Sequence, residues 1–292
     1  MTPQAQIPLP GELFVDHVAH FVPDLGAAAR VLGALGFAVT PESAQRTQDG
    51  PAGTSNVCVM LEQGYIEILA PTADTPNAQR LRASMARYPG VHLCCLGTPD
   101  AEGEHRRLSE HGFEPLPLVE LSRDVDAGTK VQFKVVRAAP EKMPEGRIQY
   151  VQHLTPEAIW QPRHLAHRCG AVKLACVFVV ADDPVETAAR WAHFAALLPR
   201  PAGDYVHLRA SRGDLLIGTR ERWAELLGDA PAAPALAGIA LECRATGELV
   251  SRCEMLGLPL RRVRKDLYAV QLPPALGGAW LFGTRRALGL EG

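Results

Sequence analysis

The sequence lacks the features that would assign it to a membrane, secreted or nucleic-acid-binding class. No apolar run approaches the roughly 20 residues of a membrane span. Residues 1–8 lack the basic start and apolar core of a secretory signal. The formal net charge of −2 favours neither nucleic acid nor an acidic membrane as a partner. We therefore expect a cytoplasmic protein with no nucleic-acid or membrane partner.

The cysteines also lack the pattern of a disulfide framework. The chain has seven of them, an odd number, and most lie inside apolar segments, as Cys58, Cys94, Cys95 and Cys176 do. Disulfide scaffolds are typical of small secreted domains with an even set of cysteines. We expect buried, reduced thiols.

What the chain does contain is a unit that recurs four times. In the first copy an apolar strand, Leu13 to Phe21, precedes Asp24 as a helix cap, a helix from Leu25 to Leu35, and Gly36 as its stop. A hairpin over residues 56–69 closes the unit. The order of elements is strand, helix and three strands, or βαβββ.

The second copy keeps a constant offset from the first. Asp24 recurs as Asp100 and Gly36 as Gly112, and both offsets are 76 residues (100 − 24 and 112 − 36). Weaker third and fourth copies follow from Lys173 onward. Because internal repeats decide the architecture, the sequence predicts four βαβββ modules.

This ordered series resembles the vicinal oxygen chelate superfamily, and within it the glyoxalase-like branch. The matching residues are Asp16-His17, the segment Gly53-Thr54-Ser55-Asn56 and the strand Gly64-Tyr65-Ile66-Glu67, and the match is good over about residues 12–170. In that family two modules form one curved sheet around a cavity, and four modules form two domains, as in extradiol dioxygenases. The resemblance implies an α+β fold: four βαβββ modules paired into two vicinal-oxygen-chelate-type domains with curved mixed sheets around a cavity.

The resemblance and the composition also divide the chain. We expect a glyoxalase-like domain over residues 1–154, a linker packed against one of the domains over residues 155–171, and a second, degenerate glyoxalase-like domain over residues 172–292. The segment Phe37 to Thr40 is expected to begin the second strand. The polar segment Thr40 to Gly53 lies where the family closes its cavity, so it is expected to be a lid or a mobile surface loop.

The family implies where a metal site would lie. Its ligands stand on the first and last strands of each module, and in the first module these positions hold His17 and Glu67, the latter also the candidate catalytic group. In the second module His153 sits on the last strand, where the family usually has a carboxylate. His92 is one residue out of register with the first-strand position. Because a strand alternates faces at every residue, His92 reaches the cavity only if a bulge intervenes.

A site of this composition has a definite chemical meaning. Two imidazoles and one carboxylate suit Fe(II), Mn, Ni or Zn and leave positions open for water and substrate. The family uses such an ion to chelate two neighbouring oxygens of a substrate, and no organic cofactor is expected. Each residue also has a plain alternative, since a strand histidine is more often a satisfied polar group, and Glu67 on the outer face would be a solvated charge. His20 is assigned to the face away from His17.

Three further residues are candidates for binding substrate. Asn56 follows the Gly-Thr-Ser segment and is expected either to bond a substrate oxygen or to stabilise a turn. Arg137 ends a strand, and its planar fork suits a carboxylate, although a strand-end arginine is usually solvated. Gln149 shares a strand face with His153.

The second half has lost the ligand set. The positions that answer to His17 and Glu67 lie near Val177 and Leu216, and the fourth module has no histidine. We expect this half to buttress the first domain, mediate a homodimer or bind something without metal.

Two functions stay open at this point. One is a metal-dependent lyase, isomerase or dioxygenase acting on a small molecule with neighbouring oxygens, which the joint presence of His17 and Glu67 favours. The other is a metal-free protein that binds or sequesters a small molecule, like the bleomycin-resistance members of the superfamily. The missing last-strand carboxylate and the register of His92 favour this second function.

Overall fold

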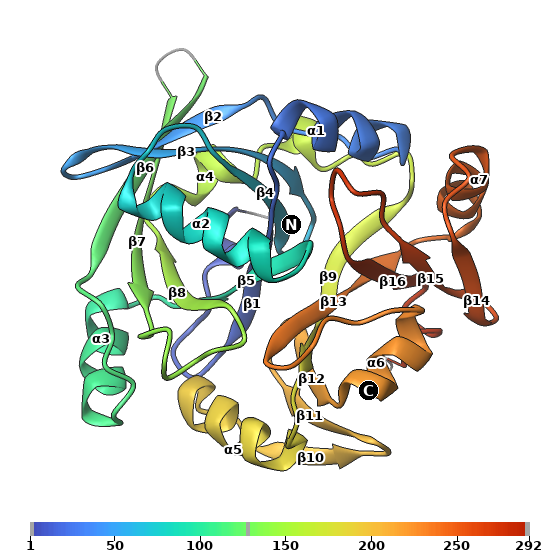
Figure 1. Cartoon of the computed structure of the whole chain (residues 1–292). Helices are drawn as coiled ribbons and strands as arrows, with labels where there is room; N and C mark the ends of the chain where they lie inside the picture. The colour runs from blue at the N-terminus through green and yellow to red at the C-terminus, as the bar shows by residue number, and fades with distance from the viewer. Residues whose placement is uncertain (1–2, 127–128, 290–292) are drawn as a thin grey trace.

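The computed structural model describes residues 3–126 and 129–289 and contains two eight-stranded mixed sheets that lie side by side (Figure 1). Seven α-helices in the described part of the chain connect and cover the strands. The predicted α+β fold of paired modules is confirmed. The outermost residues of the two expected domains, 1–2 and 290–292, lie outside the described residues.

The first sheet closes into a barrel with the strand order β1-β4-β3-β2-β6-β7-β8-β5. In each half the first and last strands are parallel neighbours, β1 with β4 and β5 with β8, and the antiparallel pair β1 and β5 joins the halves. The strands are β1 (Phe14–Phe21), β2 (Ser43–Thr47), β3 (Gly50–Met60), β4 (Tyr65–Pro71), β5 (Gly90–Gly97), β6 (Val119–Asp126), β7 (Thr129–Arg137) and β8 (Arg147–His153).

Aspartate caps begin the module helices of the barrel, as the sequence predicts. The side chain of Asp24 accepts from the backbone N–H of Ala27 at the start of α1 (Leu25–Ala34), and Asp100 does the same for α3 (Ala101–Glu110). A further helix that the sequence analysis does not predict, α2 (Pro76–Arg87), joins the two halves of the barrel and is capped by Thr75.

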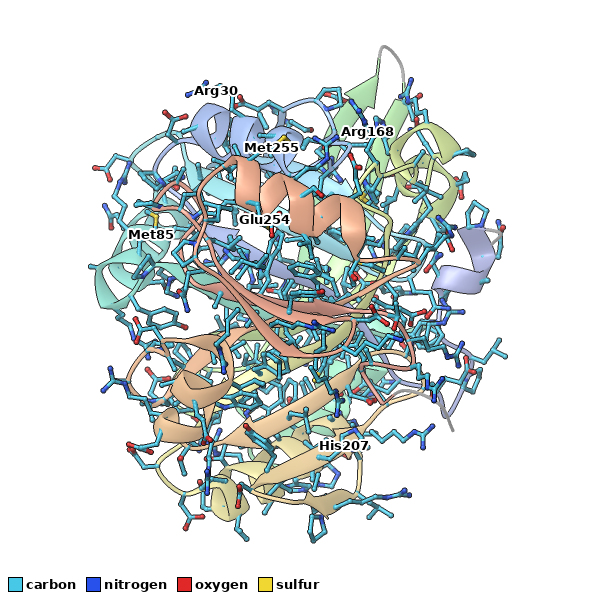
Figure 2. All side chains as sticks on the ribbon, turned by 90° about the vertical axis from the view of Figure 1, so that its right-hand side faces the viewer. Arg30, Met85, Arg168, His207, Glu254 and Met255 are labelled. Atoms are coloured by element: carbon cyan, nitrogen blue, oxygen red, sulfur yellow. The ribbon has the colours of Figure 1, made fainter. Side chains whose placement is uncertain are left out.

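The second sheet is open and repeats the same plan in the order β10-β11-β12-β9-β13-β16-β15-β14. Its helices are α5 (Pro184–Ala195), α6 (Arg220–Leu227) and α7 (Gly247–Met255), and Figure 2 is viewed from the α7 side. The strands are β9 (Ala171–Val180), β10 (Pro199–Ala202), β11 (Tyr205–Arg209), β12 (Asp214–Gly218), β13 (Ala235–Cys243), β14 (Leu260–Arg264), β15 (Leu267–Gln271) and β16 (Ala279–Gly283).

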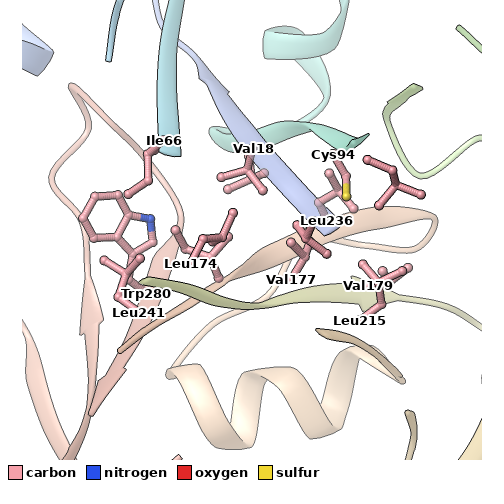
Figure 3. Close-up of a cluster of buried hydrophobic side chains, with 14 of the residues drawn as sticks. Val18, Ile66, Cys94, Leu174, Val177, Val179, Leu215, Leu236, Leu241 and Trp280 are labelled. Atoms are coloured by element: carbon pink, nitrogen blue, oxygen red, sulfur yellow. The ribbon is translucent and has the colours of Figure 1, made fainter. Parts of the chain in front are cut away.

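One hydrophobic core joins the two sheets. Side chains on the outer face of the barrel, such as Val18 and Cys94, meet Val177 and Leu236 of the second sheet (Figure 3). These four side chains are at most 1% exposed. Removing this much apolar surface from water is the main force that holds the sheets together.

His20 is a polar member of this layer. Its Nδ1 donates to the carbonyl oxygen of Leu276 at 3.2 Å, and its Nε2 accepts from Trp280 Nε1 at 3.0 Å. The ring therefore faces the second sheet, which agrees with its assignment to the face away from His17. Both ring nitrogens are used, so His20 is a structural residue.

The segment expected to be a lid is part of the barrel wall. Residues 43–47 form β2, which pairs with both β3 and β6, and β3 begins at Gly50. Residues 37–42, where the second strand was expected to begin, contain no strand. The pairing with β6 comes from the other module, a contact that local composition cannot reveal.

The segment after residue 154 packs on the barrel. It contains the short helices α4 (Pro156–Ile159) and η2 (Pro162–His164), and another 3-10 turn, η1 (Pro3–Gln6), precedes β1. Trp160 is 3% exposed and packs with Tyr65 in a cluster at one end of the barrel. None of the helices in residues 3–126 and 129–289 combines the length and apolar character needed to cross a membrane.

Candidate functional site

All eight strands of the barrel contribute side chains to one interior cavity. The space open to the centres of water-sized atoms is about 30 Å³, room for about two waters, so a larger molecule can enter only if the lining side chains move apart. The lining residues are His17, Gln45, Asn56, Tyr65, Glu67, Leu69, Leu93, Leu121, Arg123, Phe133, Val135, Arg137, Arg147, Gln149 and Val151. His17 and Glu67 thus face the same cavity, as predicted.

A β-bulge in β1 places two adjacent polar side chains inside the barrel. The register between β1 and β5 slips between Val15 and His17, so Asp16 is the extra residue. The Asp16 carboxylate accepts from His17 Nδ1 at 2.6 Å and from His153 Nε2 at 2.9 Å. The sequence predicts no role for Asp16 in the site, because simple alternation along a strand puts its side chain on the face opposite His17.

The environment keeps Asp16 ionised. Burial alone would raise the pKa of this carboxyl group, but the charges and hydrogen bonds of His153 and His17 outweigh burial and hold the pKa well below its ordinary value. An ionised carboxylate only accepts hydrogen bonds, so Nδ1 of His17 carries the proton. Tyr65 stacks on the His17 ring with centroids 4.3 Å apart.

The Asp16 contact fixes what His17 can do. With its proton on Nδ1, a neutral His17 ring keeps its lone pair on Nε2. A carboxylate behind an imidazole is the arrangement that orients either a metal ligand or a general base. Either use requires the lone pair that this hydrogen bond preserves.

Two amides hold the Glu67 carboxylate in place. Asn56 Nδ2 donates to Glu67 Oε1 at 2.5 Å, and Gln45 Nε2 donates to the same oxygen at 3.0 Å. Thr54 Oγ1 in turn donates to Gln45 Oε1 at 2.8 Å. These bonds offset the cost of burying a carboxylate that is only 6% exposed. Asn56 lies inside β3 and not in a turn, and its Oδ1 is buried without a partner.

The pairing register places Gln149, not His153, at the position equivalent to Glu67. Glu67 lies beside Ala19 in the pair β1–β4, and Gln149 lies beside Cys95 in the pair β5–β8. His153 lies four residues further along β8, bonded to Asp16, with its Nδ1 buried and unpartnered. His153 therefore does not occupy the last-strand position at which the sequence predicted it.

His92 lies outside the cavity lining. Its Nε2 donates to the carbonyl oxygen of Tyr88 at 2.8 Å, and its ring stacks against Phe21 with centroids 5.3 Å apart. A register slip does occur at this residue, between the pairs Ala19–Leu93 and His20–Val91. The slip does not bring the ring into the group that lines the cavity with His17.

The second sheet carries no His–Glu pair at the positions equivalent to His17 and Glu67, although His207 and Asp214 form an imidazole–carboxylate contact at 3.0 Å on β11 and β12. His17 pairs with the residue two positions before Glu67, and Cys176 pairs with Asp214, two positions before Leu216. Cys176 therefore takes the place of His17, whereas Val177 packs into the core between the sheets. Leu216 takes the place of Glu67, as expected. Burial raises the pKa of the Cys176 thiol well above its ordinary value, so it is a poor source of thiolate.

The side chains in the barrel that could bind a divalent ion differ from the predicted set, because Gln149 replaces His153. Across residues 3–126 and 129–289 no three His, Cys, Asp or Glu side chains come together as a metal cluster. His17 and Glu67 do share the cavity with Gln149, whose Oε1 is buried and without a hydrogen-bond partner. An imidazole nitrogen, a carboxylate and an amide oxygen are all ligands that Zn, Fe, Ni or Mn accept.

Comparison with known proteins supports this architecture. A family model described as "Glyoxalase-like domain" matches residues 15–195, more than half of the chain. A hypothetical protein from Staphylococcus aureus has a similar structure, with a TM-score of 0.65 and 14% identity over 93% of this chain and 99% of the other. No curated protein matches the sequence at a significant level.

Two other solved structures share the fold. One is a xylose isomerase-like TIM barrel/4-hydroxyphenylpyruvate dioxygenase fusion protein, with a TM-score of 0.58, 12% identity and coverage of 92% of this chain but only 48% of the other. The second is a mutant 4-hydroxymandelate synthase from Streptomyces coelicolor, with a TM-score of 0.52, 13% identity and 94% coverage of both chains. At such identities the likeness concerns the fold alone.

Proposed function

Because the chain belongs to the glyoxalase-like domain family, we propose that its barrel binds a small molecule with two neighbouring oxygens and transforms it with a divalent metal ion. The reaction class is that of a lyase, an isomerase or a dioxygenase. The observation that carries the proposal is the pair formed by Glu67 and an Asp16-oriented His17 in one cavity.

The roles of the residues follow from their contacts. His17, Glu67 and Gln149 would hold the ion, which supplies Lewis-acid chemistry at the chelated oxygens. Asp16 keeps the His17 lone pair available by fixing the ring proton on Nδ1. Glu67 is the one carboxylate among the lining residues, so it is the group that takes a proton from a bound substrate. Asn56 turns its unpartnered Oδ1 to a substrate hydroxyl.

A second candidate is a metal-free protein that binds or sequesters a small molecule. Two observations favour it. His153 lies four residues beyond the last-strand ligand position of β8 and is not among the residues that line the cavity with His17 and Glu67. The last-strand position of the second module carries a neutral glutamine, which leaves the ion with one carboxylate to balance its charge.

Metal addition separates the two candidates. We expect Mn, Fe(II), Ni or Zn, at about 100 times its dissociation constant, to stabilise metal-stripped protein by about 2.7 kcal/mol. His17→Ala and Glu67→Gln should each abolish this stabilisation, the second by removing a charge while keeping the shape. Thermal melts with and without each ion measure the effect, on protein purified without a nickel column. His111→Ala, which changes an exposed ring outside the barrel cavity, is the control.

If wild type and both site variants melt identically with every ion, the metal-dependent proposal fails. The metal-free binding function then becomes the account of the barrel.

A further inference from the structure

Three arginines project into the barrel cavity from neighbouring strands. Arg123 lies on β6, Arg137 ends β7 and Arg147 begins β8, and all three line the cavity. Glu67 is the one acidic side chain in the same lining. The wall formed by β6, β7 and β8 is therefore strongly positive.

These guanidinium groups have no carboxylate partner among the described residues. Arg137 makes no side-chain hydrogen bond there, and its Nε is buried. Arg147 donates to Asn77 Oδ1 at 3.2 Å and lies over the Phe21 ring, 5.3 Å from the centroid. Arg123, 5% exposed, contacts the Cys58 sulfur at 3.8 Å. All of these partners are neutral.

Such a cluster of like charges lowers the stability of the fold. Three largely buried positive charges share one carboxylate, Glu67, so much of the hydration that they lose is not replaced. Burial is the largest cause that lowers the pKa of Arg137 to about 10 and that of Arg147 to about 9. Nearby positive charge acts in the same direction, from Arg80 on Arg137 and from Arg137 and Arg80 on Arg147, while Glu67 opposes it. Both groups still carry their charge at neutral pH, so the strain of their mutual repulsion stays in the fold.

We propose that Arg137, Arg147 and Arg123 bind an anionic group of the substrate, which is therefore a small carboxylate or phosphate. A guanidinium fork matches either oxyanion with two parallel hydrogen bonds. Arg137 lies directly opposite Gln149 in the pairing of β7 with β8, and Arg147 lies two residues before Gln149 on the same strand face. The anionic group would thus lie beside the neighbouring oxygens that the proposed function requires.

This inference rests on the proposed site but not on a metal. It is tested on metal-stripped protein, so its failure is separate from a failure of the metal experiment. The structural alternative is that the arginines merely stabilise the barrel. Removing the charge of Arg137 should stabilise the protein if the arginines form an anion site, and should destabilise it if they stabilise the barrel.

The first measurement is the melting temperature without ligand. Arg137→Met keeps most of the side-chain length and removes an unpaired charge, so we expect Tm to rise by about 2–4 °C. Arg106→Met removes the same charge from an exposed position of α3 and should leave Tm nearly unchanged. A fall in Tm of Arg137→Met by several degrees would assign this arginine to structure and overturn the proposal.

The second measurement is binding of small probes at constant ionic strength, by calorimetry. Pyruvate and inorganic phosphate represent the two oxyanion sources, and pyruvamide is the neutral counterpart of pyruvate. We expect one or both anions to bind wild type and Arg106→Met at least tenfold more tightly than Arg137→Met. Arg137→Lys, which keeps the charge without the fork, should retain part of the affinity.

Whichever anion binds identifies the oxyanion source. Equal binding of pyruvate and pyruvamide, or equal affinity of wild type and Arg137→Met for both anions, would refute the anion site. Binding of neither anion to wild type would refute it as well.

Discussion

Lowering the pH from 6.5 to 4 is expected to remove about 6 kcal/mol from the free energy of unfolding, through two buried histidines. Burial lowers the pKa of His20 to about 4, against the opposing hydrogen bond to Leu276. Burial also lowers the pKa of His92 to about 4, against its bond to Tyr88 and aided by the nearby charge of His20. One pKa unit corresponds to about 1.4 kcal/mol, so each ring contributes about 3 kcal/mol.

The direction follows from proton binding. The unfolded chain takes up a proton on each ring near pH 6.5, whereas the folded chain does so only near pH 4. Between these values the unfolded state holds more protons, so the free energy of unfolding falls with the pH. The contribution is complete above about pH 6.5, is lost progressively as the pH falls from 6.5 to 4, and is gone below pH 4.

Urea unfolding at several pH values between 7 and 4 measures this slope. His20→Gln should be less stable at neutral pH, because one terminal amide cannot keep both the bond to the Leu276 carbonyl oxygen and the bond from the Trp280 indole. The variant should nevertheless lose less stability on acidification. His111→Gln changes an exposed ring and should keep the wild-type slope. A wild-type stability that stays flat down to pH 4 would contradict this account of both buried rings.

Replacing Asp16 by alanine should destabilise the fold by about 4 kcal/mol and weaken metal binding by 10- to 100-fold. The carboxylate accepts from two imidazoles, each bond to a charged acceptor is worth about 1.5–3 kcal/mol, and removal leaves both rings buried without a partner. Metal affinity falls because the His17 ring loses the group that orients it. Denaturant unfolding and titration with the stabilising ion measure the two effects.

Asp16→Asn refines this test, because it preserves volume but offers one acceptor where two are needed. One imidazole must then change its tautomer or face an N–H group. The control is Asp24→Ala, which removes the cap of α1 at a cost of about 1 kcal/mol and should leave metal affinity unchanged. If Asp16→Ala binds metal as wild type does, Asp16 does not position His17.

The parts of the fold that follow from short-range signals were predictable. Asp24 and Asp100 mark helix starts, and the 76-residue offset pairs His17 with Leu93. The structure agrees, because β1 and β5 pair symmetrically, His17 with Cys95 and Ala19 with Leu93. Where the loops of two modules have equal length, sequence offset and spatial equivalence coincide.

The predictions fail where the two modules differ in the length of their connections or where the structure depends on contacts between distant segments. Glu67 and its equivalent Gln149 are 82 residues apart (149 − 67), not 76, because the second module has longer connections. A constant offset therefore cannot locate the last-strand position, and the sequence predicted His153 there instead of Gln149. Asp16 was missed because a bulge carries no residue signature here, and only a bulge turns two adjacent side chains to one face.

The convergence of the arginines was equally hidden. Arg123, Arg137 and Arg147 come from three strands. Arg137 and Arg147 stand at strand ends, where an arginine is usually solvated, and Arg123 lies inside β6. Only closure of the sheet into a barrel turns them inward together. Arg137 was a candidate through its own chemistry, whereas the positive wall is a property of the barrel.

Strand β1 has His17 on its inner face and His20 on its outer face, where the indole of Trp280 holds it. The strand that carries His17 is thus held in part by Trp280, which lies far along the chain and outside the lining of the cavity. Substitutions around Trp280 are therefore expected to change the packing of the outer face of β1 without altering any residue that lines the cavity. The barrel is also not expected to keep this geometry when it is expressed without the second half, because the outer face of β1 would lose the side chains that pack on it.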